Sequence, residues 1–209
     1  LDALAEESIV FPQGYVSGTV CSPTRAGLIS GRYQQRLGYE YNISNDNVSG
    51  DGMPTWVPIL PEQFQAGDFF TGCIGKWHLG SASDKQPQNR GFNFFFGLWS
   101  GSRAYFRDGS METNREKRIK RNTTNINWWS EASFNGNVLD SAGKGRHLTD
   151  AFGDEMARFV RDHAADPDGF FLYVPFTSPH GPYGLAKQQD MNQFNGTSFN
   201  NQQKKSAAL

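Results

Sequence analysis

The chain has 209 residues, a formal net charge of −1 at pH 7 and 37% hydrophobic residues. This balance fits one domain or a large part of one, and nothing in it favours a nucleic acid as a partner. The longest apolar run, Phe170–Phe176, is far too short to span a bilayer.

The N-terminal residues predict a helix and then a short strand. Leu1 and Leu4 share one face, as in the last turns of a helix that ends near Glu7. The apolar run from Ile9 to Phe11 is typical of a strand. A segment of small residues then leads to the next predicted element.

Residues 21–32 predict a short helix with Cys21 at its tip. Pro23 suits a first helical turn, where a missing N–H costs nothing, and Gly31 can end the helix in a left-handed conformation. Arg25, one turn on, can reach back towards Cys21. The helix N-terminus would stabilise a thiolate or an oxyanion built on this side chain. A lone cysteine is, however, more often a small buried hydrophobe.

The next informative stretch follows a polar loop, residues 42–52, and a brief helix predicted to open at Pro61. Residues 69–80 begin as an aromatic and β-branched strand and end in polar groups flanked by glycine. In extended backbone, Lys76 and His78 would leave the same face at the carboxyl end of the strand, where ligands gather in α/β folds. The alternative is that both are ordinary solvated side chains. Cys73 lies within the strand, where packing is the better interpretation.

An aromatic run and a basic run occupy the middle of the chain. Residues 90–97 are interpreted as core rather than as a sugar-stacking surface, because large aromatics supply most of a core's buried area. Residues 115–121 are basic, which favours a solvated insertion over a surface that attracts a sulfated polyanion. Trp128 and Trp129 follow in a predicted loop and receive no role.

The clearest helix covers residues 148–160. Its apolar stripe predicts one buried face, and Thr149 or Asp150 can cap its start. A turn leads to the apolar strand 170–176, of the kind that is buried on both faces. A helix that feeds a buried strand is an α/β crossover, so His180 should reach the same sheet edge as Lys76 and His78.

The remaining segments have weaker signals. His147 and His163 are interpreted as surface residues. Residues 188–205 are polar and predict a long loop, and residues 206–209 predict the opening of another helix.

The motifs named so far resemble those of one family. Cys21-Ser22-Pro23-Thr24-Arg25, followed by Gly31-Arg32, resembles the Cys-x-Pro-x-Arg signature of the sulfatases. Residues 75–80, Gly-Lys-Trp-His-Leu-Gly, resemble the second sulfatase signature, and residues 91–97 resemble the aromatic run that follows it. Pro179-His180 after an apolar strand resembles the third landmark. The resemblance implies an α/β fold, the alkaline-phosphatase-like sandwich with a mostly parallel central sheet and flanking helices.

The resemblance also implies a reaction. In this family the cysteine is oxidised to formylglycine, and its hydrate attacks the sulfur of an aryl or carbohydrate sulfate ester. Lys76 and His180 would bind the sulfate, Arg25 would hold the formylglycine, and His78 would orient or deprotonate the hydrate. Which histidine protonates the leaving oxygen stays open at this point.

The implied metal is one Ca²⁺ ion held by hard oxygen ligands. Cys21, as formylglycine, is the only ligand that can be transferred to this sequence, because neither the early acidic pair nor the late Asp-Asn stretch of the family is present and Asp2 does not match. Residues 1–209 are therefore expected to be part of a sulfatase catalytic domain, inactive on their own, that lacks segments at both ends.

Partners and compartment follow from the same resemblance. The implied partners are a sulfated small molecule or polysaccharide and a formylglycine-generating maturation enzyme, and the implied location is periplasmic or secreted. The sequence itself does not decide the compartment. No secretory signal is visible in a chain that begins at Leu1, and the sequons at Asn42, Asn47, Asn122 and Asn195 can arise by chance in so polar a sequence.

Two alternatives stay open. A phosphonate or phosphodiester hydrolase of the same superfamily can share the Cys-x-Pro-x-Arg turn, and a non-catalytic protein could bind sulfated glycans through its aromatic and basic surface. A protein tyrosine phosphatase is disfavoured, because its nucleophilic cysteine and arginine are spaced further apart and a histidine precedes the cysteine.

Overall fold

A computed structural model describes residues 2–43, 51–101, 105, 120–123, 147–181 and 186–208, with backbone only at 120–123. Its helices and strands run in the order α1 Asp2–Glu6, α2 Cys21–Ser30, η1 Gln34–Leu37, α3 Leu60–Ala66, β1 Phe70–Lys76, η2 Ser83–Lys85, η3 Pro87–Asn89, β2 Phe94–Leu98, β3 Lys120–Thr123, α5 Leu148–His163, β4 Phe170–Tyr173, α6 Gln188–Asn192 and α7 Asn201–Ala207. Within these ranges, none of the helices has the length and apolar character that crossing a bilayer requires.

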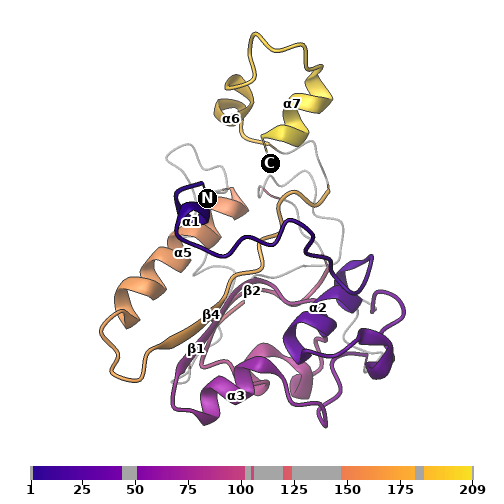
Figure 1. Cartoon of the computed structure of the whole chain (residues 1–209), viewed down its shortest axis with the longest axis vertical. Coiled ribbons are helices and arrows are strands. Elements are labelled where there is room, and N and C mark those ends of the chain that lie inside the picture. The colour runs from indigo at the N-terminus through magenta and orange to yellow at the C-terminus, as the bar shows by residue number, and fades with distance from the viewer. Residues whose placement is uncertain are drawn as a thin grey trace.

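The centre of the fold is a mixed sheet with strand order β3-β2-β1-β4. Strand β1 pairs in parallel with both β2 and β4, and β3 closes the other edge antiparallel to β2. Helices α2 and α3 lie on one side of the sheet and α5 on the other (Figure 1). The predicted α/β class, with a mostly parallel sheet and flanking helices, is confirmed.

A separate apolar core covers each face of the sheet. Phe95 belongs to the core beneath α2 and α3, whereas its neighbours Phe94 and Phe96 belong to the core beneath α5. This split follows from the alternation of side chains along a strand. The aromatic run is therefore core, as predicted, and α5 contributes Phe152 and Phe159 to its own side.

Several predicted elements differ from the structure. Residues 9–11 form no strand and lie exposed, since an apolar run becomes a strand only where another strand pairs with it. Residues 188–205 contain α6 and most of α7 instead of a loop, and Asn200 caps α7 by accepting a hydrogen bond from the Gln203 N–H. Residues 206 and 207 therefore end a helix and do not begin one.

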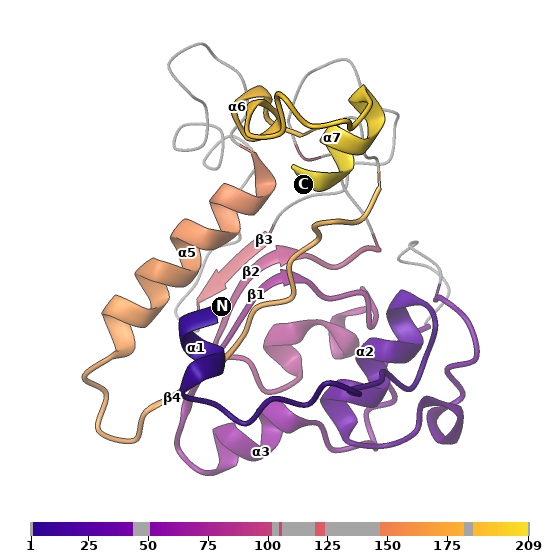
Figure 2. The same cartoon turned by 45° about the horizontal axis from the view of Figure 1, so that its top comes forward.

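The crossover unit is also different in detail. Strand β4 stops at Tyr173 and its residues are only half-buried, because β4 pairs on one side alone among the described strands. Neither Thr149 nor Asp150 caps α5, whose N-cap is His147 and which has no side-chain capping hydrogen bond. In Figure 2, α6 and α7 lie beyond the end of the sheet at which β1 finishes. The basic run 115–121 lies outside the described residues except where β3 begins, as do Trp128 and Trp129.

Candidate active site

Cys21 is the first residue of α2, as the sequence predicts. The preceding residue, Val20, is extended and serves as N-cap, and Gly31 ends the helix with φ 64°. The Ser22 N–H, one of the free donors of the first turn, is bound by the Asn42 side-chain oxygen at 2.9 Å. Ala26 and Ile29 fix the helix in the core, and Cys21 itself is partly exposed. A reactive group on Cys21 would therefore be held rigidly and remain accessible.

Arg25 links the Cys21 helix to the sheet. Its Nη1 donates to the Lys76 carbonyl oxygen at 2.5 Å and lies 3.5 Å from the Tyr173 hydroxyl. Burial raises the pKa of Tyr173 to about 12, with Arg25 acting in the opposite direction, so the phenol is neutral. The Arg25 guanidinium thus lies at the carboxyl end of β1, and its hydrogen bond holds α2 next to Lys76.

Lys76 and His78 are buried, with 2% and 4% of their surface exposed. The interpretation of the two as solvated side chains is therefore wrong. The expected extended geometry is also wrong, since β1 ends at Lys76 and His78 has a left-handed φ of 55°. The backbone is held by hydrogen bonds from the Lys76 N–H to the Pro175 oxygen and from the His78 N–H to the Trp99 oxygen.

The His78 imidazole is neutral at physiological pH. Burial is the largest cause that lowers its pKa, the charges of Lys76 and Arg25 act in the same direction with a smaller contribution from His180, and together they bring the pKa to about 3. Neither ring nitrogen has a hydrogen-bond partner of good geometry within the described ranges. The Ile43 backbone raises the pKa of His78 and offsets only part of its lowering. Gly101 packs on the ring so closely that a Cβ there would lie 2.4 Å from Cε1.

His180 follows β4 on an exposed turn. Its N–H donates to the Thr177 oxygen at 2.8 Å, and its ring Nδ1 lies 2.8 Å from the Gly181 carbonyl oxygen. Since a carbonyl only accepts, Nδ1 donates this hydrogen bond, and no described residue binds Nε2. His180 acts electrostatically on His78, which places it with the other predicted site residues.

The structure therefore brings the predicted residues together from three elements. Cys21 and Arg25 come from α2, Lys76 and His78 from the end of β1, and His180 from the turn after β4. Cys73, in contrast, is fully buried inside β1, and burial raises the pKa of its thiol. Its predicted packing role is consistent with this position.

The interpretation of His147 and His163 as surface residues is wrong. His147 is buried and stacks on the Tyr105 ring. His163 is half-buried, stacks on Phe70 and pairs its Nδ1 with the Asp166 carboxylate at 2.6 Å. Both lie on aromatic surfaces contributed by residues distant in sequence, which a single-sequence pattern does not show.

Sequence reasoning also missed side chains around the site. Tyr105, Tyr173, Asn42 and Gly101 contact the site residues, yet each stands alone in a polar or aromatic segment without a motif of its own.

The described residues do not fit a calcium site. No group of three or more His, Cys, Asp or Glu side chains in these ranges could hold a metal ion. The charged groups at the site, Arg25 and Lys76, are cations. The arrangement is suited to binding an anion next to Cys21.

Comparison with known proteins agrees with an anion-binding site at these residues. A family model described as Sulfatase matches residues 1–207. The uncharacterized sulfatase YdeN of Escherichia coli K12 is 29% identical over 217 residues, which cover 92% of this chain and 34% of that protein. N-acetylgalactosamine-6-sulfatase of Rattus norvegicus is 29% identical over 206 residues, covering 95% of this chain and 37% of that protein. The chain thus spans about a third of the length of these curated relatives.

A solved structure shows the same fold. The crystal structure of Ps i-CgsB in complex with k-i-k-neocarrahexaose superposes with a TM-score of 0.73 at 24% identity, covering 93% of this chain and 42% of that chain. The predicted alkaline-phosphatase-like architecture is confirmed.

Proposed function

Because this chain belongs to the sulfatase family, we propose that the whole protein hydrolyses sulfate esters, with a formylglycine made from Cys21 as nucleophile. The observation that carries the proposal is the hydrogen bond from Arg25, on the Cys21 helix, to the Lys76 carbonyl oxygen. It brings this helix to the buried Lys76 and His78 at the end of β1. An accessible Cys21 lies at the start of the helix that bears Arg25.

Each residue has a role that its environment supports. The Lys76 ammonium is buried, so it would stabilise charge on the sulfuryl oxygens more strongly than a solvated cation would. Arg25, fixed on the Lys76 carbonyl, would orient the Cys21-derived nucleophile. One hydroxyl of the hydrated aldehyde would attack sulfur and displace the alcohol, whose oxygen takes up a proton. The second hydroxyl would then lose its proton as the C–O bond to the covalent sulfate breaks, so that sulfate leaves and the aldehyde re-forms.

The histidines divide the proton chemistry. A pKa of about 3 makes His78 a poor base near neutral pH, which favours orienting the hydrate over deprotonating it. His180 is exposed and its Nε2 has no partner among the described residues, so in its protonated form the ring would deliver a proton from Nε2 to the leaving oxygen.

For the substrate, we favour a carbohydrate sulfate ester over a simple aryl sulfate. The support is that one relative is named N-acetylgalactosamine-6-sulfatase and that Ps i-CgsB was solved with neocarrahexaose. The proposal for the whole protein includes one Ca²⁺ ion whose ligands, apart from the formylglycine made from Cys21, lie outside the described residues. It also includes a maturation enzyme that converts Cys21 and a periplasmic or secreted location.

The mass of the Cys21 peptide tests the nucleophile. Intact protein from a host able to convert the cysteine should yield a peptide with an aldehyde in place of the thiol, and it should turn over an aryl sulfate. An unmodified thiol together with glycan binding would support the non-catalytic alternative. A strong preference for an aryl phosphodiester over the aryl sulfate would support the phosphodiester hydrolase instead.

Replacing Lys76 tests the anion site. Lys76→Ala in the intact protein should lower kcat by roughly 10²–10³, the usual cost of one group that stabilises transition-state charge. Arg161→Ala is the matched control, because this exposed cation lies near the end of α5, where the chain turns back to the start of β4. Turnover close to wild type for Lys76→Ala would refute the role given to Lys76.

A further inference from the structure

We propose that Tyr105 is a positioning residue for His180, and this inference rests on the proposed function of the site. Tyr105 is 1% exposed, and its hydroxyl donates a hydrogen bond of 2.7 Å to the backbone carbonyl of His180. The tyrosine lies 75 residues from His180 in sequence. Its contact determines where the turn that bears His180 is held.

Tyr105 is itself firmly fixed. Its backbone oxygen accepts the Leu148 N–H at 2.8 Å, at the first residue of α5. Its ring stacks on His147 with centroids 5.1 Å apart and planes within 6° of parallel, and it packs in the core beneath α5. A buried phenol needs a partner for its hydroxyl, and the His180 carbonyl supplies one. The hydrogen bond therefore joins a rigid support to an exposed residue.

The turn that bears His180 has little burial of its own. Pro179 and His180 are exposed, whereas Thr177 is buried. A hydroxyl pair of 2.7 Å between Thr149 and Ser178 ties the turn to the first turn of α5. The Tyr105 bond adds a second tie, at the residue that carries the functional ring.

Three contacts then fix His180, and none of the described residues binds its Nε2. The N–H binds the Thr177 oxygen, the carbonyl binds Tyr105, and Nδ1 binds the Gly181 oxygen. Loss of the Tyr105 bond frees the carbonyl and lets the peptide between His180 and Gly181 rotate, which moves the partner of Nδ1 as well. Tyr105 thereby controls both the position of Nε2 and the nitrogen that carries the proton.

The experiment is a double-mutant cycle in the intact, converted protein. Tyr105→Phe keeps the ring and its stacking on His147 but removes the hydroxyl. It should lower kcat/KM for an aryl sulfate about 10- to 100-fold, since misplacing a catalytic group by about 1 Å costs up to about 10²-fold. His180→Ala should cost more, and Tyr105→Phe should then have no further effect in the His180→Ala background. Tyr33→Phe, at an exposed tyrosine, is the matched control.

A second measurement does not depend on turnover. In protein with ¹³C-labelled histidine, Tyr105→Phe should shift the His180 ring signal, assigned by its loss in His180→Ala, and Tyr33→Phe should leave it in place. An unmoved His180 signal overturns the proposal, and so does an equal loss of kcat/KM in the presence and absence of His180. A wild-type protein with an unmodified Cys21 or no sulfatase activity would refute the proposed function, while the His180 signal would still decide the role of Tyr105.

Discussion

His78 is a buried imidazole next to two cations. Burial is the largest cause of its lowered pKa, and Lys76 and Arg25 add to it. The neutral ring is consequently the only stable form in the folded chain near neutral pH, whereas the unfolded chain protonates the same ring with a pKa near 6.5. Because the folded and unfolded pKa values of His78 differ, the free energy of unfolding depends on pH through this residue.

The sign of this linkage follows from the two pKa values. The folded-state pKa of about 3 is below the unfolded value of 6.5, so the unfolded state takes up a proton first as the pH falls. Stability that is present above pH 6.5 is thus lost between pH 6.5 and 3, by at most about 1.4 kcal/mol per pH unit.

His78→Gln should remove this contribution. Urea unfolding of the intact protein at pH 7 and pH 5, at fixed calcium concentration, should show a smaller loss of unfolding free energy on acidification for the variant than for wild type. An equal loss in both proteins would mean that His78 does not stay neutral in the folded state.

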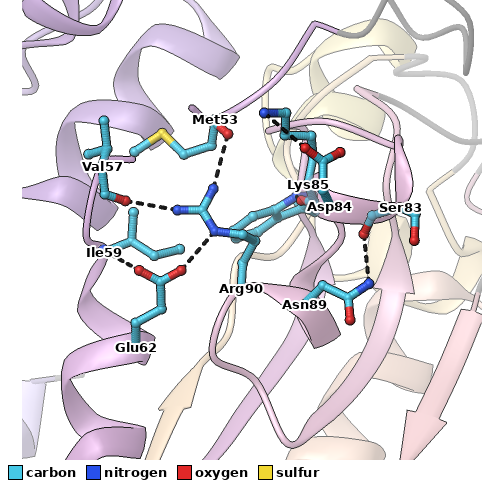
Figure 3. Close-up of polar contacts among 10 residues, drawn as sticks. Met53, Val57, Ile59, Glu62, Ser83, Asp84, Lys85, Asn89 and Arg90 are labelled. Carbon is cyan, nitrogen blue, oxygen red and sulfur yellow. Dashed lines mark hydrogen bonds and ion pairs between the residues drawn. The ribbon is translucent and has the colours of Figure 1, made fainter. Parts of the chain in front are cut away.

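At the scale of elements, Arg90 joins three segments (Figure 3). Its guanidinium is buried and binds the Glu62 carboxylate at 2.8 Å, the Met53 oxygen at 3.0 Å and the Val57 oxygen at 2.9 Å. The other Glu62 oxygen accepts the Ile59 N–H at the start of α3. This Arg90 network fixes α3 and the segment before it against the loop that leads into β2.

The two charged partners in the Arg90 network should differ in importance. Arg90→Met leaves two buried carbonyls and one oxygen of the half-buried Glu62 carboxylate without this partner, so we expect a loss of about 3 kcal/mol in unfolding free energy. Glu62→Gln keeps an oxygen for Arg90 and leaves the carbonyl bonds intact, and should cost about 1 kcal/mol. Denaturant unfolding of both variants measures the order, and a loss for Glu62→Gln equal to that for Arg90→Met would contradict it.

The elements that carry a local signal were predictable. Pro23 and Gly31 mark the limits of α2, and the apolar stripe of α5 predicts its buried face, although Val160 lies off it and is partly exposed. The predictions for residues 9–11 and for the α7 segment were wrong for the same physical reason. Whether an apolar run pairs as a strand, or a polar run with an N-cap forms a helix, depends on neighbours that the run itself does not specify.

At the scale of the whole molecule, the two halves of the site rest on different cores. Ala26 and Ile29 anchor the Cys21 helix in the core on one face of the sheet, and Tyr105 and Leu148 belong to the core on the other. Strand β1 lies in the sheet between α2 and α3 on one side and α5 on the other (Figure 2), and its last residue is Lys76. The sheet therefore sets the relation between the nucleophile and His180.

Much of the candidate site followed from the sequence, because the carboxyl ends of parallel strands meet at one edge. That rule brought Lys76, His78 and His180 together. It did not give the burial of Lys76, the bond from Arg25 to the Lys76 carbonyl, or the support of His180 by Tyr105. Each of these depends on a contact between distant segments, and such contacts exist only after both cores have formed.

The charge of the described site bears on the metal. Arg25 and Lys76 are positive, His78 is neutral, and the described residues contain no group of three or more metal-ligating side chains. A Ca²⁺ ion next to these cations would need carboxylate oxygens from the rest of the protein, both as ligands and to offset the positive charge. The effect of chelation should therefore be measured on the intact protein, which would supply those oxygens.

Removing calcium from the intact protein with a chelator should lower both its turnover of an aryl sulfate and its Tm, since an ion that binds only the folded state stabilises it by mass action. Added Ca²⁺ should restore both, and Mg²⁺ at the same concentration should restore less, because the smaller ion demands tighter octahedral geometry. Metal content measured before and after dialysis is the control. Unchanged turnover and Tm in protein shown to be metal-free would remove calcium from the proposed function and leave the chemistry of Cys21 to be tested by its peptide mass.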